Sequence, residues 1–259
     1  MRLAFLVSED YDFMYDMFHN LFLLLQEEHT LVGFIALPNK LAQHRGIKIF
    51  SAYLQIFGLK TFLWLSMRTI LKRLKIILGF FFKHYPAYSY KQLCKYYNIP
   101  RLKYTDPNHP DVVEWVNNQD IDMLIIFSGF ILKQPLIEAV NYCILNKHAG
   151  LLPAYRGVFP VFWALKNHDP VGVTIHKVNE NIDDGEIIIQ KRYPAQKDYT
   201  VYDYYRVIYQ NTPDLIISSL KLLEDEKREP IIHQLSDSYY SLPTKAEFKA
   251  FTRSGLRFI

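Results

Sequence analysis

The sequence NKHAGLLPAYRG occupies residues 146–157 and directly follows a short apolar run. Together with Asn146 this run, residues 143–146, predicts a strand leading out of a core. Asn146 and His148 are two residues apart, so on an extended chain their side chains share one face while Lys147 points to the other. Ligands bind at the carboxyl ends of strands in open α/β sheets, and we therefore expect a site here.

A carboxylate follows in the sequence IDDG, residues 182–185, where Asp183 lies 35 positions after His148. An amide, an imidazole and a carboxylate together can transfer an acyl group to an amine without a metal ion or a covalent intermediate. Attack of the amine on the acyl carbon places negative charge on the acyl oxygen. The amide N–H can donate a hydrogen bond to this oxyanion, and losing one such donor typically lowers the rate by about 10²–10³. The imidazole can donate when protonated or accept a proton when neutral. Asp-Asp-Gly is also a good turn sequence, which stays open as an alternative.

The two stretches together resemble the folate-dependent formyltransferase family. Its pattern is roughly Asn-x-His-x-Ser-Leu-Leu-Pro, then an aromatic, a basic residue and Gly, and later Asp-x-Gly. Gly150 stands where the family usually has Ser. The resemblance implies direct formyl transfer from 10-formyltetrahydrofolate to an amine, with Asn146, His148 and Asp183 as catalytic residues. It is strong over residues 120–192, loose over 1–40 and absent over 45–98.

The resemblance also implies binding residues. Backbone groups after a buried strand, and others beside Asp183, would bind the folate: Phe127, Ser128, Gly129, Phe130, Ile131, Leu132, Ile182 and Asp184. The acceptor side would be formed by Tyr155, Arg156, Gly157, Thr174 and His176. Two alternatives stay open here: Arg156 as a solvated loop cation, and His176 as a packed strand histidine.

Charge is unevenly distributed along the chain, whose net charge is +4. Residues 29–105 contain no Asp or Glu but 13 Lys or Arg, which leaves 17 cations against 26 anions elsewhere. This asymmetry indicates that one face meets an anionic partner. The candidates are a nucleotide diphosphate, RNA, or the surface of an acidic membrane.

Residues 45–98 form an insertion with large apolar residues at helical spacing. The longest uncharged run, residues 49–59, has 11 residues, whereas about 20 are needed to span a bilayer. One interpretation is an inserted helical hairpin packed on the sheet edge. The other is a basic amphipathic helix, within residues 60–83, that lies on an anionic membrane surface.

Alternating strands and helices predict an α/β fold with a doubly wound, mostly parallel sheet. The resemblance implies the Rossmann-like formyltransferase version, with a helical insertion and a short C-terminal extension. No Gly-x-Gly-x-x-Gly follows the first strand, so no dinucleotide cofactor is expected. We expect a catalytic domain over 1–195, including the 45–98 insertion, and a C-terminal helix with an aromatic tail over 196–259. The predicted strands are 2–7, 30–37, 101–103, 121–127, 143–146, 171–178 and 186–193; the predicted helices are 12–26, 91–98, 110–118, 158–166 and 200–223.

The acceptor is the open part of the functional interpretation. Methionyl-tRNA enzymes carry a further C-terminal RNA-binding barrel, for which this chain is too short, and glycinamide-ribonucleotide enzymes lack a large apolar insertion. We therefore expect an amino sugar linked to a nucleotide, and no nucleic-acid partner. The alternatives are a methionyl-tRNA or glycinamide-ribonucleotide type of transferase, a formyltetrahydrofolate hydrolase, and a non-catalytic folate-binding or membrane-surface scaffold.

The two cysteines, Cys94 and Cys143, form no zinc or disulfide pattern, and no metal is expected. The N-terminus predicts a first strand and not a signal peptide. We expect a cytoplasmic protein, peripheral at the inner membrane face if the insertion meets lipid. A homodimer formed through the tail or the insertion stays open.

Overall fold

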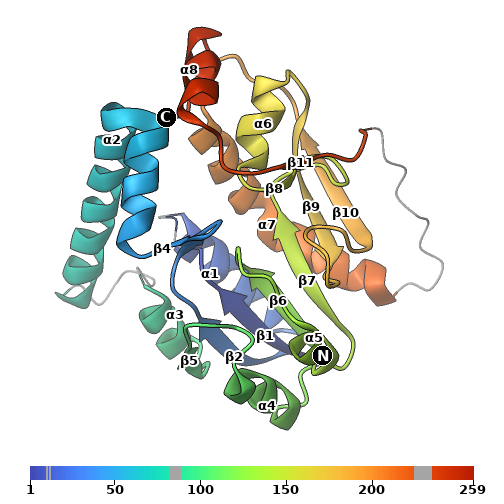
Figure 1. The fold of residues 1–259 in the computed structure, drawn as a ribbon. Coiled ribbons are helices and arrows are strands. Elements are labelled where there is room, and N and C mark those ends of the chain that lie inside the picture. Colours follow the sequence, from blue (N-terminus) through green and yellow to red (C-terminus); the bar gives the residue numbers. More distant parts are fainter. Residues whose placement is uncertain (10, 12, 82–88, 225–234) are drawn as a thin grey trace. The chain divides into compact units, whose positions relative to one another are not determined.

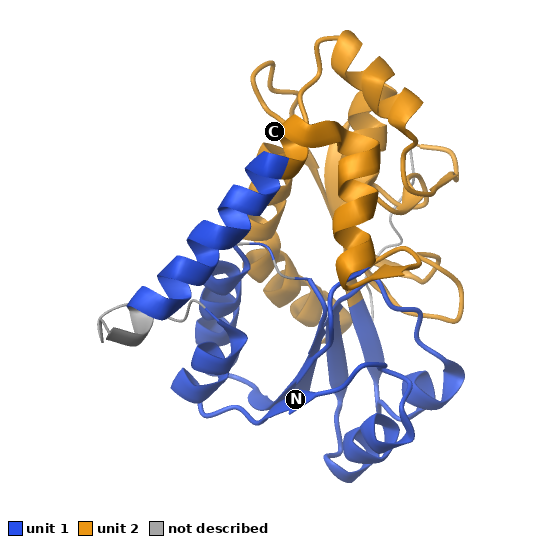
Figure 2. Cartoon of the chain, turned by 60° about the vertical axis from the view of Figure 1, so that its left-hand side comes forward, with its two compact units in different colours: residues 1–40, 63–145 blue, residues 41–62, 146–259 orange. Residues whose placement is uncertain are grey.

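The computed structural model describes residues 1–9, 11, 13–81, 89–224 and 235–259 (Figure 1). Its contacts divide the chain into two compact units (Figure 2). Unit 1 comprises residues Met1–Lys40 and Leu63–Leu145, and unit 2 comprises Leu41–Phe62 and Asn146–Ile259. These units do not coincide with the predicted division at residue 195, which stays a prediction about functional domains.

Unit 1 contains four parallel strands in the order β6-β1-β2-β5. In β1 the side chains of Leu3, Ala4, Phe5 and Leu6 are all inaccessible to solvent. Because successive side chains of a strand point to opposite faces, both faces of this strand are covered, as is typical of parallel sheets. The elements of this unit are β1 Arg2–Val7, α1 Met14–Leu25, β2 Thr30–Ala36, α3 Tyr90–Tyr96, β5 Arg101–Lys103, α4 Pro110–Asn118, β6 Met123–Phe127 and α5 Gln134–Glu138.

Aromatic rings form the core of unit 1. Phe18 of α1 is at the centre, with ring centroids 5.0 Å from Phe127, 5.5 Å from Phe34 and 6.1 Å from Phe5. All three pairs have edge-to-face geometry, which adds about 0.5–1.5 kcal/mol per pair beyond the burial of area. The rings therefore hold α1 against the strands of its own unit.

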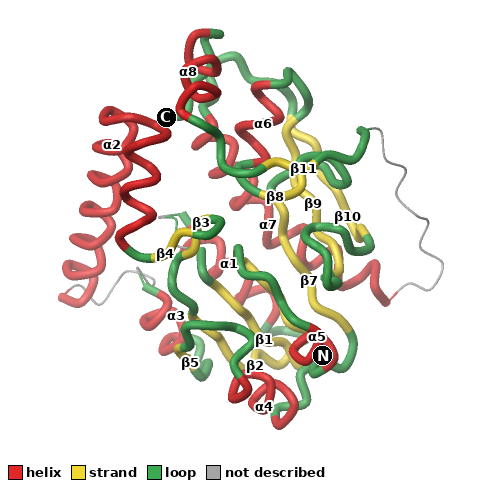
Figure 3. Tube along the Cα trace, viewed as in Figure 1, coloured by secondary structure: helices red, strands yellow, loops and turns green. Residues whose placement is uncertain are grey.

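Unit 2 contains the antiparallel strands β9 and β10, against which α7 packs, and α6 packs against β9 (Figure 3). β7, Cys143–His148, crosses the unit boundary, so that Asn146 and His148 belong to unit 2. A short parallel pair joins β8 to β11. The remaining bounds are β8 Arg156–Gly157, α6 Pro160–Lys166, β9 Val171–Lys177, β10 Ile187–Tyr193, α7 Val201–Glu224, β11 Tyr239–Tyr240 and α8 Lys245–Arg253.

The strand order β10-β9-β7-β6-β1-β2-β5 forms one seven-stranded, mostly parallel sheet. The predicted α/β fold class is confirmed. The predicted bounds of β1, β5 and α4 agree with the structure, and the other predicted elements outside the insertion differ by no more than two residues at either end. Residue 12, the predicted start of the first helix, lies outside the described residues.

The insertion forms α2, Ile47–Phe81, preceded by a pair of two-residue strands, β3 Lys40–Leu41 and β4 His44–Arg45. Gly58 leaves the helical conformation, with φ 74° and ψ 176°, and divides α2 into segments 47–57 and 59–81. Glycine adopts such a positive φ without a steric penalty. In unit 2, Phe57 is buried with its ring centroid 4.5 Å from that of Phe258 and 5.1 Å from that of Phe248. The first segment is thus anchored in the core of unit 2. The insertion forms two helical segments, and their packing as a hairpin on the sheet edge stays a prediction.

Candidate active site

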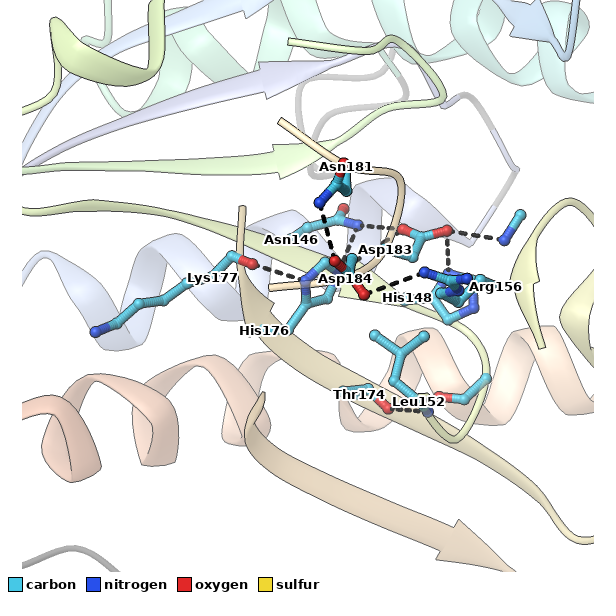
Figure 4. Close-up of polar contacts among 12 residues, drawn as sticks. Asn146, His148, Leu152, Arg156, Thr174, His176, Lys177, Asn181, Asp183 and Asp184 are labelled. Atoms are coloured by element: carbon cyan, nitrogen blue, oxygen red, sulfur yellow. Dashed lines mark hydrogen bonds and ion pairs between the residues drawn. The ribbon is translucent and has the colours of Figure 1, made fainter. Parts of the chain in front are cut away.

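The three predicted catalytic side chains lie together in unit 2 (Figure 4). Asn146 and His148 end β7, and Asp183 lies in the loop between β9 and β10. Oδ1 of Asp183 accepts a hydrogen bond from Nδ2 of Asn146 at 3.3 Å, and Oδ2 lies 3.4 Å from Nδ1 of His148. The backbone N–H of Gly157 donates to Oδ2 at 2.9 Å. The carboxylate of Asp183 therefore contacts Asn146, His148 and the loop formed by residues 149–157, which we call the motif loop.

The loop that carries Asp183 is a tight turn as well as a site. Asp183 has φ 49°, in the left-handed region that Asp tolerates better than most residues. A Cβ on Gly185 would lie 1.8 Å from the carbonyl oxygen of Lys177, so only glycine lets the loop close against the end of β9. The turn interpretation and the catalytic interpretation of IDDG are therefore compatible.

His148 is buried and both of its ring nitrogens face acceptors. Nε2 lies 2.8 Å from the carbonyl oxygen of Tyr155, which requires a proton on Nε2. Nδ1 faces the carboxylate of Asp183. The ring is therefore held between a backbone carbonyl on one side and the Asp183 carboxylate on the other.

His176 orients the amide of Asn146. Its Nδ1 lies 2.8 Å from the carbonyl oxygen of Lys177 and must carry a proton to donate there. Burial lowers the pKa of His176 to about 4, although the nearby carboxylate of Asp183 opposes that shift. The ring is thus neutral near pH 7, and its Nε2 accepts from Nδ2 of Asn146 at 3.0 Å. This contact fixes which end of the Asn146 side chain carries the N–H groups.

Arg156 is held by two carboxylates. Nη1 lies 3.1 Å from Oδ1 of Asp184, and Nη2 lies 3.2 Å from Oδ2 of Asp237. An anionic substrate group could reach this guanidinium only by sharing it with them or displacing one. The expected substrate contact of Arg156 stays a prediction, and the structure adds a role in tying the Asp183 loop to the motif.

Two other predicted substrate contacts are engaged within the protein. Thr174 is fully buried, donates to the carbonyl oxygen of Gly150 at 2.6 Å and accepts from the N–H of Leu152 at 3.1 Å. Tyr155 is buried as well, and its hydroxyl donates to Asp169. Burial and that hydrogen bond raise the pKa of Tyr155. Both side chains are thus supports of the motif loop. Among the described residues, no group of three or more His, Cys, Asp or Glu could hold a metal ion.

The C-terminal segment is a part of the site that the motif did not predict. Ser238 accepts from the backbone N–H of Tyr155 at 2.9 Å through its hydroxyl, and its carbonyl accepts from that of Arg156 at 2.9 Å. The ring of Tyr240 stacks between those of Tyr155 and Trp163, at centroid distances of 5.4 and 4.7 Å. The Tyr-rich run 239–240 was a weak signal for this closure of the site.

The predicted folate loop belongs to unit 1, where it follows β6. Ser128 accepts from the N–H of Phe130 and from the hydroxyl of Ser8, each at 3.1 Å, so the turn is held by its own hydroxyl. Phe127, Phe130 and Leu132 are buried, whereas Ile131 is exposed. Gly129 is exposed too, and the nearest atom to an added Cβ is the carbonyl oxygen of Lys40 at 3.7 Å. That distance is an ordinary van der Waals contact, and folate binding at this loop stays a prediction. In unit 2, Ile182 is also exposed.

Sequence comparison connects this chain with formyltransferases. It is 30% identical over 143 residues to a methionyl-tRNA formyltransferase from Borrelia garinii subsp. bavariensis, which covers 53% of this chain and 42% of that protein. A methionyl-tRNA formyltransferase from a Synechococcus strain is 29% identical over 54% of this chain and 44% of its own length. The chain thus spans less than half the length of these relatives.

Structural comparison gives the same fold. A sugar N-formyltransferase from a Shewanella strain aligns with a TM-score of 0.57 and 19% identity, over 93% of this chain and 77% of that one. A glycinamide ribonucleotide transformylase from Symbiobacterium toebii aligns with a TM-score of 0.59 and 17% identity, over 88% and 92%. The family model described as formyl transferase matches residues 87–220, more than half of the 259 residues. The site and these likenesses agree, and the chain belongs to the formyl transferase family.

Proposed function

We propose that this protein is an N-formyltransferase that moves a formyl group from 10-formyltetrahydrofolate to the amine of an amino sugar linked to a nucleotide. The observation that carries formyl transfer is the contact of one carboxylate, Asp183, with both Asn146 and His148. A module that only binds folate has no need of this arrangement. We also propose a reducing, cytoplasmic setting, in which the thiols of Cys94 and Cys143 would stay reduced.

The chemistry follows from the groups that meet at Asp183. The neutral amine attacks the formyl carbon, a C–N bond forms, and the carbonyl electron pair moves to oxygen. Asn146 donates to this oxyanion, as does His148 when protonated. The attacking nitrogen loses a proton, which His148 or Asp183 accepts directly or through water. The bond from carbon to N10 of the folate then breaks, and N10 takes a proton, which yields tetrahydrofolate and the formamide.

Two hydrogen bonds, one made by His148 and one by Asn146, must be replaced by hydrogen bonds to the oxyanion during this reaction. Nε2 of His148 donates to the carbonyl oxygen of Tyr155, so donation to an oxyanion requires the ring to leave that carbonyl. For Asn146, the weaker of its two contacts is the one to Asp183 at 3.3 Å, and that N–H is the one available to the oxyanion. The 3.0 Å contact to His176 would persist and keep the amide oriented.

The choice of an amino sugar rests on two supports. The likeness to the Shewanella sugar N-formyltransferase extends over 93% of this chain. The same coverage holds for WlaRD, a sugar 3N-formyl transferase whose structure contains dTDP and 5-N-formyl-THF. Residues 29–105 of this chain, which lack Asp and Glu but hold 13 cations, suit a nucleotide diphosphate.

Methionyl-tRNA is the second candidate acceptor, and a specific observation favours it. The sequence relatives at 29–33% identity are methionyl-tRNA formyltransferases. The same excess of cations would suit the phosphates of a tRNA. A glycinamide-ribonucleotide acceptor is supported by solved structures of that type.

The first experiment is an absorbance assay for tetrahydrofolate release from 10-formyltetrahydrofolate. Each reaction contains one acceptor from a panel of nucleotide-linked amino sugars, glycinamide ribonucleotide or methionyl-tRNA, with a reaction lacking acceptor as the control. Release with one sugar, together with a formyl mass gain on that sugar, supports the proposal. Release with methionyl-tRNA or glycinamide ribonucleotide alone refutes the sugar acceptor but not formyl transfer. Release without acceptor identifies a hydrolase, and folate binding without release identifies a scaffold.

A further inference from the structure

The second segment of α2, whose backbone is drawn in Figure 1, carries a continuous row of exposed large apolar side chains. Positions 63, 67, 70, 71, 74, 77 and 78 follow the i, i+4, i+7, i+8 spacing that lines one face of a helix. Each of these side chains keeps about half of its surface exposed, between 48% and 56%. Among the described residues of unit 1, these side chains therefore leave a large part of their apolar surface to solvent. We refer to Leu63, Met67, Ile70, Leu71, Leu74, Ile77 and Leu78 as the α2 stripe.

Cations surround the α2 stripe, and residues 59–81 contain no Asp or Glu. At 100° per residue, Arg73 and Lys75 lie on opposite flanks of the stripe, and both are exposed. Lys72 lies on the face opposite the stripe, where its Nζ is 5.1 Å from the ring centroid of Tyr15 in α1. The helix therefore turns one side to its own unit and presents to solvent an apolar row edged by positive charge.

By length and composition, one helix among the described residues, Ile47–Leu78, could cross a membrane. Two features argue that it does not. Gly58 interrupts the helix, and Ala52, Phe57 and Thr61 are buried. A spanning orientation would have to withdraw Phe57 from its contacts with Phe248 and Phe258. It would also carry Arg68, Lys72, Arg73 and Lys75 into the hydrocarbon region, where each charge is strongly unfavourable.

We propose that residues 59–78 lie in the plane of an anionic phospholipid surface, with the α2 stripe in the boundary between headgroups and acyl chains. Arg73 and Lys75 then reach the lipid phosphates on either side, as in interfacial basic amphipathic helices. A second copy of this chain is the less favourable occupant. Two such faces would bring like charges together without any carboxylate from this segment to separate them. Residues 82 and 83 of the predicted 60–83 segment lie outside the described residues.

The test measures binding of the full chain to phosphatidylcholine vesicles with and without phosphatidylglycerol, by co-sedimentation at low and high salt. Two double variants probe the surface: Ile70→Ser with Leu74→Ser, and Arg73→Glu with Lys75→Glu. The matched control is Leu23→Ser with Leu24→Ser, because these α1 leucines are 48% and 41% exposed in the same unit. Circular dichroism and thermal unfolding check that every variant folds.

The expected result is binding that requires phosphatidylglycerol and weakens with salt. One cation near an anionic surface contributes roughly a fivefold factor, so reversal of two should weaken partition by more than about tenfold. The apolar double variant should weaken it by about tenfold or more, and the control should bind like the natural chain. Absence of binding to anionic vesicles, or binding unchanged in both α2 variants, overturns the proposal. So does a dimer in ultracentrifugation that Ile70→Ser with Leu74→Ser dissociates, or a cellular protein that resists alkaline extraction from membranes.

Discussion

A Cβ atom on Gly150 would lie 2.9 Å from Nε2 of His148 and 2.9 Å from Cβ of Pro160. Both distances are shorter than Cβ contacts in proteins normally are. Gly150 therefore makes room for the orientation in which His148 donates to the carbonyl oxygen of Tyr155. The formyltransferase pattern that this sequence resembles has Ser at this position, so the departure from that pattern adjoins the imidazole of His148.

The substitution Gly150→Ala should displace the ring of His148. A misplacement of about 1 Å can lower a rate by about 10²-fold, so we expect kcat to fall by about tenfold to a hundredfold with little change in KM for the folate. NMR of the imidazole N–H groups should show loss of the proton bonded to the carbonyl of Tyr155. An unchanged kcat with unchanged imidazole signals would show that Pro160 moves instead and that Gly150 is not required.

The substitution Asp183→Asn removes the charge that faces His148 and keeps the size of the side chain. We expect kcat to fall by about 10²–10⁴, whereas affinity for the folate should change little. Asp120→Asn is a matched control, because Asp120 has a similar left-handed backbone, with φ 48°, and is exposed in unit 1. Retained transfer in the Asp183 variant, measured by tetrahydrofolate release, would refute the mechanism.

Local patterns predicted much of this fold and of the site. Pro110 at the start of α4 and the apolar run of β1 mark their elements without reference to the rest of the chain. The alternation of Asn146, Lys147 and His148 also holds, since Lys147 points away and its Nζ donates to the hydroxyl of Tyr209 in α7 at 2.6 Å. Such signals depend on near neighbours only, which is why they can be detected in a single sequence.

Long-range pairings were not predictable in the same way. Tyr239 pairs with Arg156 across more than eighty positions, and two-residue strands have no periodicity to detect. Arg156 could be identified as a cation near the motif, but its neutralisation by Asp237 depends on that pairing. A helical hairpin requires a break in the insertion, but the position of the break at Gly58 could not be assigned, because a single glycine within an apolar helical pattern is usually tolerated.

His176 should affect kcat indirectly, by orienting the amide of Asn146. The variant His176→Phe removes the acceptor for Nδ2 of Asn146 and is expected to lower kcat by about tenfold while KM changes less. His176→Gln offers a side-chain oxygen as an acceptor and should recover part of the loss. Equal losses in the two variants would indicate that His176 contributes packing alone. Steady-state kinetics with the acceptor identified by the release assay would separate kcat from KM.

The lowered pKa of His176 also predicts a pH dependence of stability. The folded protein, with a pKa of about 4 for His176, binds fewer protons than the unfolded chain, in which an ordinary histidine titrates near 6.5. The contribution of the neutral His176 to the free energy of unfolding is therefore fully present above about pH 6.5. It is lost, by up to about 3 kcal/mol, as the pH drops toward 4. Urea unfolding of the natural chain and His176→Gln between these pH values should give a flatter profile for the variant. Parallel profiles would mean that a group other than His176 carries the proton uptake.

Tyr240 connects the C-terminal segment to the motif loop, and two substitutions separate its contributions. Tyr240→Phe removes only the hydrogen bond from Nδ2 of Asn167 to the hydroxyl, which measures 2.9 Å and is exposed. It should change the free energy of unfolding by less than about 1 kcal/mol. Tyr240→Ala also removes the ring stacked between Tyr155 and Trp163. Because Tyr240 is only partly buried, loss of the stacked ring should lower the free energy of unfolding by about 1–3 kcal/mol.

The substitution Tyr240→Ala should also affect activity, because Tyr155 links the C-terminal segment to His148. Its carbonyl oxygen holds Nε2 of His148, and its backbone N–H depends on Ser238 in the segment that contains Tyr240. A loosened segment should let the ring of His148 sample more orientations, so Tyr240→Ala should lower kcat at a temperature where the variant is still folded. Tyr240→Phe serves as the control in the same assay. If the alanine variant loses stability and keeps the kcat of the natural chain, the segment supports the fold and His148 is positioned without it.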